Sequence, residues 1–140
     1  MSATITQLSV FIENTPGRVS EVTDLLGSKG VNISGFSVAD TADYGILRLV
    51  VDEPERAAEF LRERGFTVRE NGVVCVALED KPGGLARVLK VVSGAGVNVE
   101  YVYSLLSMYV VLNVTDVDRA IELLADQPVH LVDQEELSAL

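Results

Sequence analysis

Two short segments of this chain join a Pro-Gly turn to polar side chains, a combination suited to binding a small charged molecule. They are Asn14-Thr15-Pro16-Gly17 and Asp80-Lys81-Pro82-Gly83. Each segment precedes a helix-like run, and a helix start attracts carboxylates through its free backbone N–H groups and its dipole. The glycine lets a ligand approach the backbone closely, and the carboxylate of Asp80 can hold an ammonium group. One such turn therefore suits both ends of a free amino acid.

Both turns belong to a repeat. Pro16 corresponds to Pro82 and Asn32 corresponds to Asn98, which is an offset of 66 residues at both ends (82 − 16 and 98 − 32). Each turn is followed, at the same distance, by Gly-Val-Asn and an apolar residue. A single Pro-Gly turn is most often only the start of a capped helix, but two copies at one spacing favour a duplicated module.

Each half of the chain has the pattern strand, helix, strand, strand, helix, strand. The alternation of Leu8, Val10 and Ile12 predicts a first strand that is buried mainly on one face. The next helix is expected to start at Pro16, with Asn14 or Thr15 as its cap. The apolar stripes expected on this helix and its counterpart are Val19, Val22, Leu25 and Leu26, and Leu85, Val88, Leu89 and Val92. The remaining expected elements are strands 33–38, 46–51, 66–69, 73–78, 97–105, 109–114 and 129–132, and helices that begin near Pro54 and Val117.

This order of elements indicates an α+β protein made of two ferredoxin-like (βαββαβ) modules, residues 1–70 and 71–140. Each module is expected to form an antiparallel four-stranded sheet with both helices on one face. The modules are joined through Asn71-Gly72, and Asn-Gly between two apolar runs is a strong hairpin signal. A hairpin here predicts that strand 66–69 pairs with strand 73–78, and strand 129–132 would then complete the first module. We therefore consider an exchange of the last strands between the halves.

The composition narrows the classes of function. The formal net charge of the 140 residues is −10, which argues against a nucleic acid or an anionic membrane as the partner. No apolar stretch is long enough to span a bilayer and no signal peptide is visible, so we expect a cytoplasmic protein. The single cysteine, Cys75, is expected to be a small buried filler, and the single histidine, His130, a packed or edge residue. They offer neither a nucleophile–base pair nor a transition-metal cluster, so we expect no enzyme and no cofactor.

The repeated pattern resembles the ACT domain, a small regulatory module that typically binds amino acids. The resemblance lies in the Pro-Gly turn, an apolar residue two places on, a helix of fixed length and then Gly-Val-Asn. The resemblance covers essentially the whole chain, twice. It implies ligand binding at ACT–ACT interfaces, where the loop after the first strand and the start of the second strand meet their counterparts on a neighbour. The function it implies is that of an allosteric amino-acid sensor.

Three alternatives stand beside the sensor. The chain can be a non-catalytic regulatory subunit of an amino-acid-metabolism enzyme, or a purely structural dimer whose loops bind nothing. The third, an enzyme in its own right, has the least support, because no convergent acid–base or metal set is visible in the sequence. In each case a homodimer is expected, because the open sheet faces and edge strands of two such modules need cover.

By position, the resemblance implies two ligand sites. The first comprises Asn14, Thr15, Pro16, Gly17, Arg18 and Val19, with Asn32 and Ile33, and the second comprises Asp80, Lys81, Pro82, Gly83, Gly84 and Leu85, with Asn98 and Val99. The two sites differ in charge, because Asp80 corresponds to Asn14 and Gly84 corresponds to Arg18. We favour the second copy for a ligand that carries an ammonium group. Asn32 and Asn98 are equally compatible with a turn in which asparagine hydrogen-bonds its own backbone.

Overall fold

The computed structural model describes residues 4–40, 44–105 and 108–140, and the chain divides into two compact units. The unit that we name the N-terminal module consists of Thr6–Asn71 together with Ser138–Leu140. The unit that we name the C-terminal module consists of Gly72–Leu137 together with the residues up to Ile5. Each module is described by itself below.

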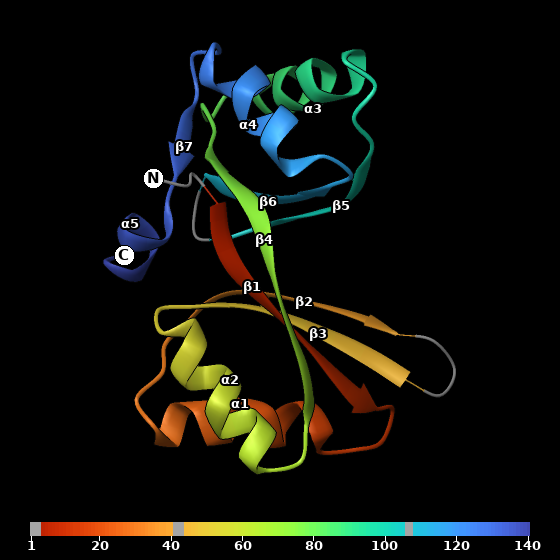
Figure 1. Ribbon diagram of the computed structural model, residues 1–140, viewed down its shortest axis with the longest axis vertical. Coiled ribbons are helices and arrows are strands. Elements are labelled where there is room, and N and C mark those ends of the chain that lie inside the picture. Colours follow the sequence, from red (N-terminus) through yellow and green to blue (C-terminus); the bar gives the residue numbers. More distant parts are fainter. Residues whose placement is uncertain (1–3, 41–43, 106–107) are drawn as a thin grey trace. The chain divides into compact units, whose positions relative to one another are not determined.

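The N-terminal module is a four-stranded antiparallel sheet with two helices on one face (Figure 1). Its elements are β1 (Thr4–Glu13), α1 (Arg18–Ser28), β2 (Ile33–Asp40), β3 (Tyr44–Val51), α2 (Pro54–Glu63) and the first part of β4 (Thr67–Ala77). The strand order is β2-β3-β1-β4, and β3 pairs antiparallel with both β1 and β2. This order leaves β2 as the edge strand of the module.

The C-terminal module repeats this plan. Its elements are the rest of β4, α3 (Gly84–Gly94), β5 (Val99–Ser104), β6 (Tyr109–Val114), α4 (Val117–Ala125), β7 (His130–Val132) and α5 (Gln134–Ser138). β6 pairs antiparallel with β4 and with β5, and β7 pairs with the other side of β4. The order β5-β6-β4-β7 leaves β5 as an edge strand, as β2 is in the first copy. The predicted α+β class and the two ferredoxin-like modules are confirmed.

The predicted hairpin at Asn71-Gly72 is wrong. The two residues lie inside β4, which runs without interruption from Thr67 to Ala77. The predicted exchange of last strands is not confirmed either, because β4 neighbours β1 and the final strand β7 pairs with Cys75–Ala77 of its own module. The pairing of β4 with its neighbouring strands thus outweighs the local turn preference of Asn-Gly. An extended Gly72 is compatible with this, since a Cβ there would meet Thr4 only at ordinary contact distances of 3.6 Å and more.

The helix starts also differ from the prediction. α1 begins at Arg18, with Gly17 as the N-cap residue, so neither Asn14 nor Thr15 caps the helix and Pro16 precedes it. Gly17 has a left-handed conformation with φ of 86°, which a glycine adopts without steric cost. The chain thus reverses at Gly17 before the helix begins.

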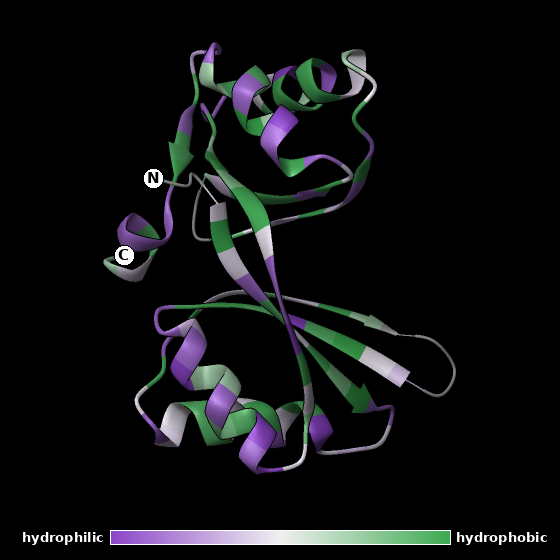
Figure 2. Cartoon of the chain, viewed as in Figure 1, coloured by the Kyte–Doolittle hydropathy of each residue, from purple (hydrophilic) through white to green (hydrophobic). Residues whose placement is uncertain are grey.

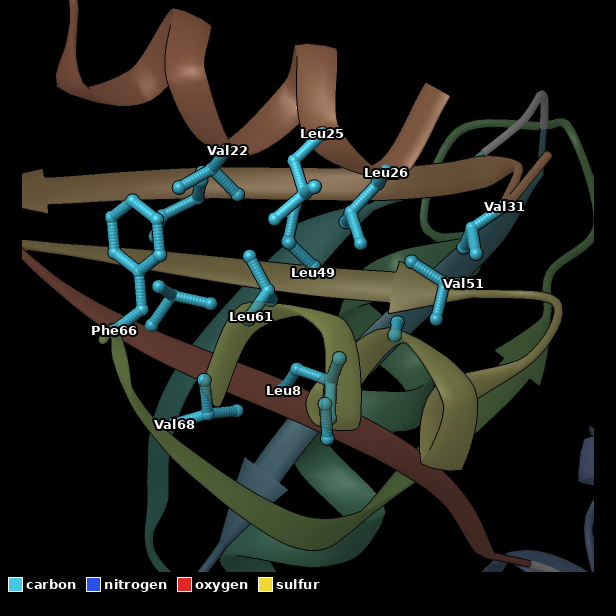
Figure 3. Packing of buried hydrophobic residues seen from close by; sticks show 14 of the residues in the cluster. Leu8, Val22, Leu25, Leu26, Val31, Leu49, Val51, Leu61, Phe66 and Val68 are labelled. Carbon is cyan, nitrogen blue, oxygen red and sulfur yellow. The ribbon is translucent and has the colours of Figure 1, made fainter. Parts of the chain in front are cut away.

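Each module has its own apolar core beneath its helices. Figure 3 shows Val22, Leu25 and Leu26 of α1 pointing toward Leu49 and Val51 of β3, and all five are buried. The hydropathy colours follow the same division, with purple residues along the outer sides of the helices (Figure 2). The second core includes Val88 and Val92 of α3, Leu112 and Leu124.

Two expectations about burial need correction. The first member of each helical stripe is not in the core, because Val19 is 38% exposed and Leu85 is 40% exposed. The second face of β1 is also partly buried, because Gln7 and Ser9 are buried whereas Phe11 on the same face is 37% exposed. The amide nitrogen of Gln7 donates to the Ser9 hydroxyl and to the Asn71 amide oxygen, both at 3.4 Å, which satisfies a polar group in a buried position.

The lone cysteine and histidine are placed as their sequence context suggested. Cys75 is fully buried, and burial together with the charge of Glu136 raises the pKa of its thiol from 9.0 to about 12. His130 lies on the short edge strand β7, and its Nε2 is 2.7 Å from a carboxylate oxygen of Glu136 in α5.

Candidate functional site

The two Pro-Gly loops have the same backbone hydrogen bonds. In the first, the N–H of Thr15 donates to the carbonyl of Glu13 (2.8 Å) and that of Arg18 to the carbonyl of Thr15 (3.4 Å). In the second, the N–H of Lys81 donates to the carbonyl of Glu79 (2.9 Å) and that of Gly84 to the carbonyl of Lys81 (3.1 Å). The repeat in sequence is therefore a repeat in loop geometry.

Both helices start without a side-chain cap. Gly17 and Gly83 are the N-cap residues, with φ of 86° and 85°, and neither helix has a side-chain cap hydrogen bond. By contrast, the carboxylate of Asp116 caps α4 by accepting from the N–H of Arg119 at 3.0 Å. The first turn of a helix has N–H groups without an intrahelical acceptor, so α1 and α3 offer donors to an anion from outside.

The charge beside the first loop comes from Arg18, which is largely engaged within its own module. Its guanidinium lies 4.7 Å from the centre of the Phe66 ring, and Nη1 is 2.7 Å from a carboxylate oxygen of Glu21. Its Nε is buried without a hydrogen-bond partner in the described residues. Arg18 therefore closes the side of the module near Phe66 and brings positive charge to the helix start.

The second loop has its own internal ion pair. The ammonium group of Lys81 is 2.7 Å from a carboxylate oxygen of Glu79. The hydrogen bond from Lys81, followed by the charges of Lys81 and Arg87, lowers the pKa of Glu79. Within the described part of the chain, the neighbouring carboxylate of Asp80 has no ion pair. Asp80 is thus the negatively charged group of this loop that can pair with a positively charged ligand.

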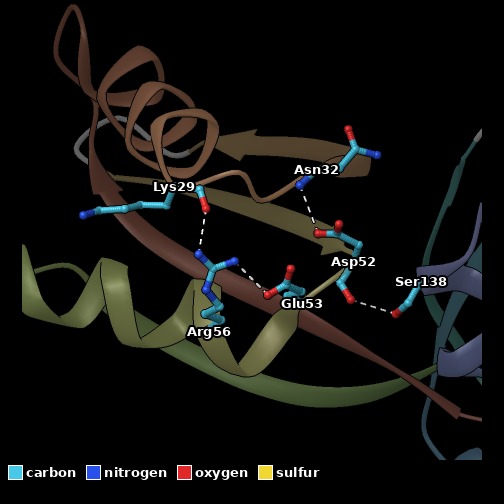
Figure 4. Close-up of polar contacts among 6 residues, drawn as sticks. All are labelled: Lys29, Asn32, Asp52, Glu53, Arg56 and Ser138. Carbon is cyan, nitrogen blue, oxygen red and sulfur yellow. Dashed lines mark hydrogen bonds and ion pairs between the residues drawn. The ribbon is translucent and has the colours of Figure 1, made fainter.

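The two asparagines of the repeat are held by their backbones. The N–H of Asn32 donates to a carboxylate oxygen of Asp52 (2.9 Å), and the N–H of Asp52 donates back to the carbonyl of Asn32 (3.1 Å). Asn98 makes the same pair of bonds with Thr115, at 3.1 Å and 3.0 Å. Both asparagine side chains are exposed, and Figure 4 shows the amide of Asn32 pointing away from Asp52. The sharp turn before them is made by glycine, since Gly30 and Gly96 have φ of 75° and 80°.

Asp52 makes hydrogen bonds both to Asn32, just before β2, and to Ser138 near the C-terminus (Figure 4). Its backbone carbonyl accepts from the hydroxyl of Ser138 at 2.7 Å, while its carboxylate holds Asn32. Next to it, the guanidinium of Arg56 donates to the carbonyl of Lys29 and pairs with Glu53 at 2.8 Å. These bonds fix the turn between α1 and β2.

A hollow of about 260 Å³ lies between α1 and strands β2 and β3 of the N-terminal module. Its lining is apolar apart from one hydroxyl and consists of Val19, Thr23, Ile33, Phe36, Val38, Leu47 and Leu49. Leu47 and Leu49 are buried and form its floor, whereas Phe36 and Val38 are exposed on the edge strand β2. The module therefore has an apolar hollow that opens at its edge.

The structure brings together only some of the predicted site residues. Val19 and Ile33, from the helix start and the start of β2, line the same hollow. In the second copy, Lys81 and Gly84 lie together around a much smaller hollow with Glu79, Arg87 and Val129. Most of the other predicted residues lie in the two exposed loops and at the two asparagine positions. Arg18 and Leu85 lie in the first turns of α1 and α3, and Val99 packs partly buried against the core of its module at the start of β5.

Sequence reasoning missed the other lining residues of the larger hollow. Thr23 lies four residues after Val19 on one helix face, so helical spacing alone links the two. Phe36 and Val38 alternate along β2 and are exposed. In the sequence, the alternation of Phe36 and Val38 within the expected strand 33–38 placed them on one face, and this was the available signal.

Other classes of site have less support in the described residues. No group of three or more His, Cys, Asp and Glu side chains there is arranged to hold a metal ion. Among the helices of residues 4–40, 44–105 and 108–140, none combines the length and the apolar run that crossing a membrane requires.

Comparisons with known proteins match the chain over almost its whole length. A family profile described as an ACT domain pair matches residues 3–140. No curated protein matches the chain. The crystal structure of protein BT0572 from Bacteroides thetaiotaomicron superposes with a TM-score of 0.93 at 37% identity, covering 99% of this chain and 98% of that one.

More distant structures share the fold. The ligand-free regulatory subunit of aspartate kinase from Thermus thermophilus has a TM-score of 0.64 at 19% identity, covering 86% of this chain and 88% of that one. The regulatory subunit of aspartate kinase from Thermus flavus has a TM-score of 0.59 at 16% identity, covering 86% of this chain and 90% of that one.

Proposed function

The chain belongs to the ACT domain pair family, and on that premise we propose that it is a cytoplasmic regulatory protein that binds a free amino acid. The observation that carries the proposal is the repeated loop, with equal hydrogen bonds, a left-handed glycine and an uncapped helix start in both copies. Because α2 also begins without a side-chain cap hydrogen bond, the missing cap alone does not distinguish these loops; the combination of the left-handed glycine with the repeated loop does. We take residues 1–70 and 71–140 as the two binding modules.

Each end of a free amino acid has a matching group at these loops. The carboxylate would accept from the backbone N–H groups at the start of α1 or α3. The ammonium group would bind the carboxylate of Asp80 in the second copy, and the neutral amide oxygen of Asn14 in the first. Asn32 and Asn98, whose exposed side chains follow the helices, would complete the two sites. The second copy provides the stronger ammonium site because only it has a charged acceptor.

The sites would lie at interfaces with a second copy of the chain. Two apolar positions are exposed in both modules, Val19 with Leu85 on the helices and Phe36 with Val102 on the edge strands, and both pairs have the repeat offset (85 − 19 and 102 − 36, each 66). Phe36 is 67% exposed and Val102 is 39% exposed. An edge strand beside exposed apolar side chains is a surface that proteins cover, so we propose a homodimer through these edges.

Regulation follows from placing a ligand at an interface. A ligand that contacts two modules favours the packing in which both contribute to its site, and it shifts the population toward that packing. The same coupling makes association increase the affinity for the ligand. In this proposal the protein catalyses no reaction, and its output is a change in its own association or in that of a partner.

A second proposal is that the chain acts as a regulatory subunit of a metabolic enzyme. The Thermus structures that share its fold are described as regulatory subunits of aspartate kinase, and one of them is matched over 88% of its length. Affinity purification of the tagged chain from its own cell extract distinguishes the two proposals. Stoichiometric recovery of one larger catalytic chain would favour the subunit, and recovery of the chain alone would favour the sensor.

The proposed function is tested by titration calorimetry of the purified protein against each of the twenty amino acids. We expect saturable heat from at least one of them. Gly17→Val and Asp80→Ala remove the two loop features separately, since valine does not tolerate a φ of 86° and alanine provides no carboxylate. We expect each variant to lose binding at its own module.

Matched controls separate loss of the site from loss of the fold. Gly65 also has a φ of 86°, and a Cβ placed there would have no heavy atom within 4 Å, but it lies outside both loops. Gly65→Val should therefore show a similar backbone strain and retain binding. Absence of heat from all twenty amino acids would exclude the sensor, and equal losses in Gly17→Val and Gly65→Val would exclude the loop as the site.

A further inference from the structure

We propose that the amino acid bound by the N-terminal module has an apolar side chain, which occupies the hollow between α1, β2 and β3. This inference rests on the proposed function, since it assigns a class to the ligand of that site. Two predicted ligand residues, Val19 and Ile33, line the hollow. A ligand held by its charged ends at the loop can thus place its side chain in the hollow.

The chemistry of the hollow selects against a polar side chain. Of its seven lining residues, six are aliphatic or aromatic. The remaining one is Thr23, whose hydroxyl already donates within its own helix, at 3.0 Å from the carbonyl of Ser20. A charged or amide side chain placed there would lose its hydration without gaining a partner. An apolar side chain gains instead, by about fourfold in affinity for each buried methylene group.

The size of the hollow agrees with a bulky apolar side chain. Its volume is about 260 Å³, which is roughly eight or nine times the share of one water molecule in the liquid. This is room for a branched aliphatic or an aromatic side chain. The floor, Leu47 and Leu49, is buried, so the side chain would displace water from a surface that has few polar groups.

The repeat contains its own comparison for this hollow. At the offset of 66, Val19 and Thr23 of α1 correspond to Leu85 and Leu89 of α3 (85 − 19 and 89 − 23). Leu89 packs partly buried against the core of its module. Both leucines are larger than their counterparts, whereas Val99, Val102 and Ser104 on β5 are smaller than Ile33, Phe36 and Val38. The corresponding space in the C-terminal module is therefore filled from the helix side and loses the aromatic wall on the strand side. We therefore place the bulky apolar ligand in the N-terminal module.

The test exchanges these residues between the copies. Calorimetry is carried out with L-leucine, L-isoleucine and L-phenylalanine as apolar probes, and with L-serine, L-aspartate and L-lysine as polar ones. We expect the tightest binding with an apolar probe. Thr23→Leu, which inserts the residue of the other copy, should weaken that binding at least tenfold, whereas the nearly isosteric Thr23→Val should leave it within threefold. Leu89→Thr should not weaken it.

A second variant keeps the test decisive if Thr23→Leu perturbs α1. Val38 is 51% exposed at the rim, so Val38→Asp places a charge beside the hollow without entering the core. We expect it to weaken an apolar probe at least tenfold. Tightest binding of a polar probe would overturn the inference and leave the proposed function intact, whereas absence of binding by all probes would overturn both.

The hollow has one competing occupant, a side chain of the second copy. In that case Thr23→Leu would weaken dimerisation in the absence of any amino acid, as measured by sedimentation velocity. This result would also overturn the inference. An unchanged dimer constant together with weakened binding of L-leucine would support it.

Discussion

Replacing two helical glycines by alanine, one at the start of α3 and one near the end of α1, should change the stability of the protein in opposite directions. Gly84 is the first residue of α3, and a Cβ built there would lie 2.4 Å from the backbone oxygen of Glu79. Real Cβ atoms essentially never approach another heavy atom closer than 3.0 Å, so the loop must move by at least 0.6 Å (3.0 − 2.4). Gly27 lies in α1 with no heavy atom within 4 Å of such a Cβ. We expect Gly84→Ala to destabilise and Gly27→Ala to stabilise the protein.

The magnitudes follow from the local geometry. Forcing a methyl group against a backbone atom costs about 1–3 kcal/mol when the surroundings give way only partly. Replacing an unencumbered helical glycine by alanine stabilises by roughly 0.5–1 kcal/mol. The two variants should therefore differ by about 1.5–4 kcal/mol, although both are the same chemical change in a helix.

The equivalent position of the first copy shows how the loop can give way. Arg18 occupies it, and the hydrogen bond from its N–H to Thr15 is 3.4 Å long, compared with 3.1 Å for the bond from Gly84 to Lys81. The second loop is thus the tighter of the two. Urea unfolding followed by circular dichroism measures both free energies of unfolding. If Gly84→Ala were as stable as the wild-type protein, the reasoning about this loop would be refuted.

Further predictions concern a buried thiol, a carboxylate that bridges two segments, and an exposed apolar side chain. Because burial raises the pKa of Cys75 to about 12, its reaction with a thiol reagent at pH 8 should be about 1000-fold slower in the folded than in the unfolded protein. The same shift should leave stability constant below pH 9 and reduce it as the pH rises toward 12. Asp52→Ala removes the acceptor of the Asn32 N–H and should cost about 1 kcal/mol in thermal unfolding. Phe36→Asp should weaken the proposed dimer at least roughly tenfold in sedimentation velocity, whereas Leu140→Asp, at an exposed position, should not.

The labelling, unfolding and association measurements each have a result that would contradict the prediction. Rapid labelling of the folded protein would show that Cys75 is accessible. An unchanged unfolding temperature of Asp52→Ala would show that its bond to Asn32 contributes nothing. Equal effects of Phe36→Asp and Leu140→Asp would show that the edge strand is not the interface.

The fold could be predicted from the sequence where local pattern and tertiary structure agree. The alternation at Leu8, Val10 and Ile12 predicted a strand whose one face is buried, and those three residues are buried. The prediction from sequence failed at Asn71-Gly72, where a strong local turn signal lies within the continuous strand β4. A turn preference is a local term of modest size, and the pairing of a whole strand outweighs it.

The candidate site could be predicted only in part, because some of its residues come together only through tertiary packing. The loops and the two asparagines follow from the repeat, which is a property of the sequence. The hollow beside Val19 is formed by Thr23 from a helix and Phe36 from a strand, which meet only when the helix packs on the sheet. The absence of a cap at Gly17 was also not predictable, because Asn14 and Thr15 are both good capping residues.

The most direct test of whether ligand binding and association are coupled is sedimentation velocity of the wild-type protein over a concentration series. It is measured with and without the amino acid that gives the strongest calorimetric signal. A ligand present at 100 times its dissociation constant, and bound only by the dimer, stabilises the dimer by about 2.7 kcal/mol for each site. We therefore expect the dissociation constant of the dimer to fall by at least roughly tenfold. A dissociation constant that is the same with and without a bound amino acid would contradict a sensor that works through its module interfaces.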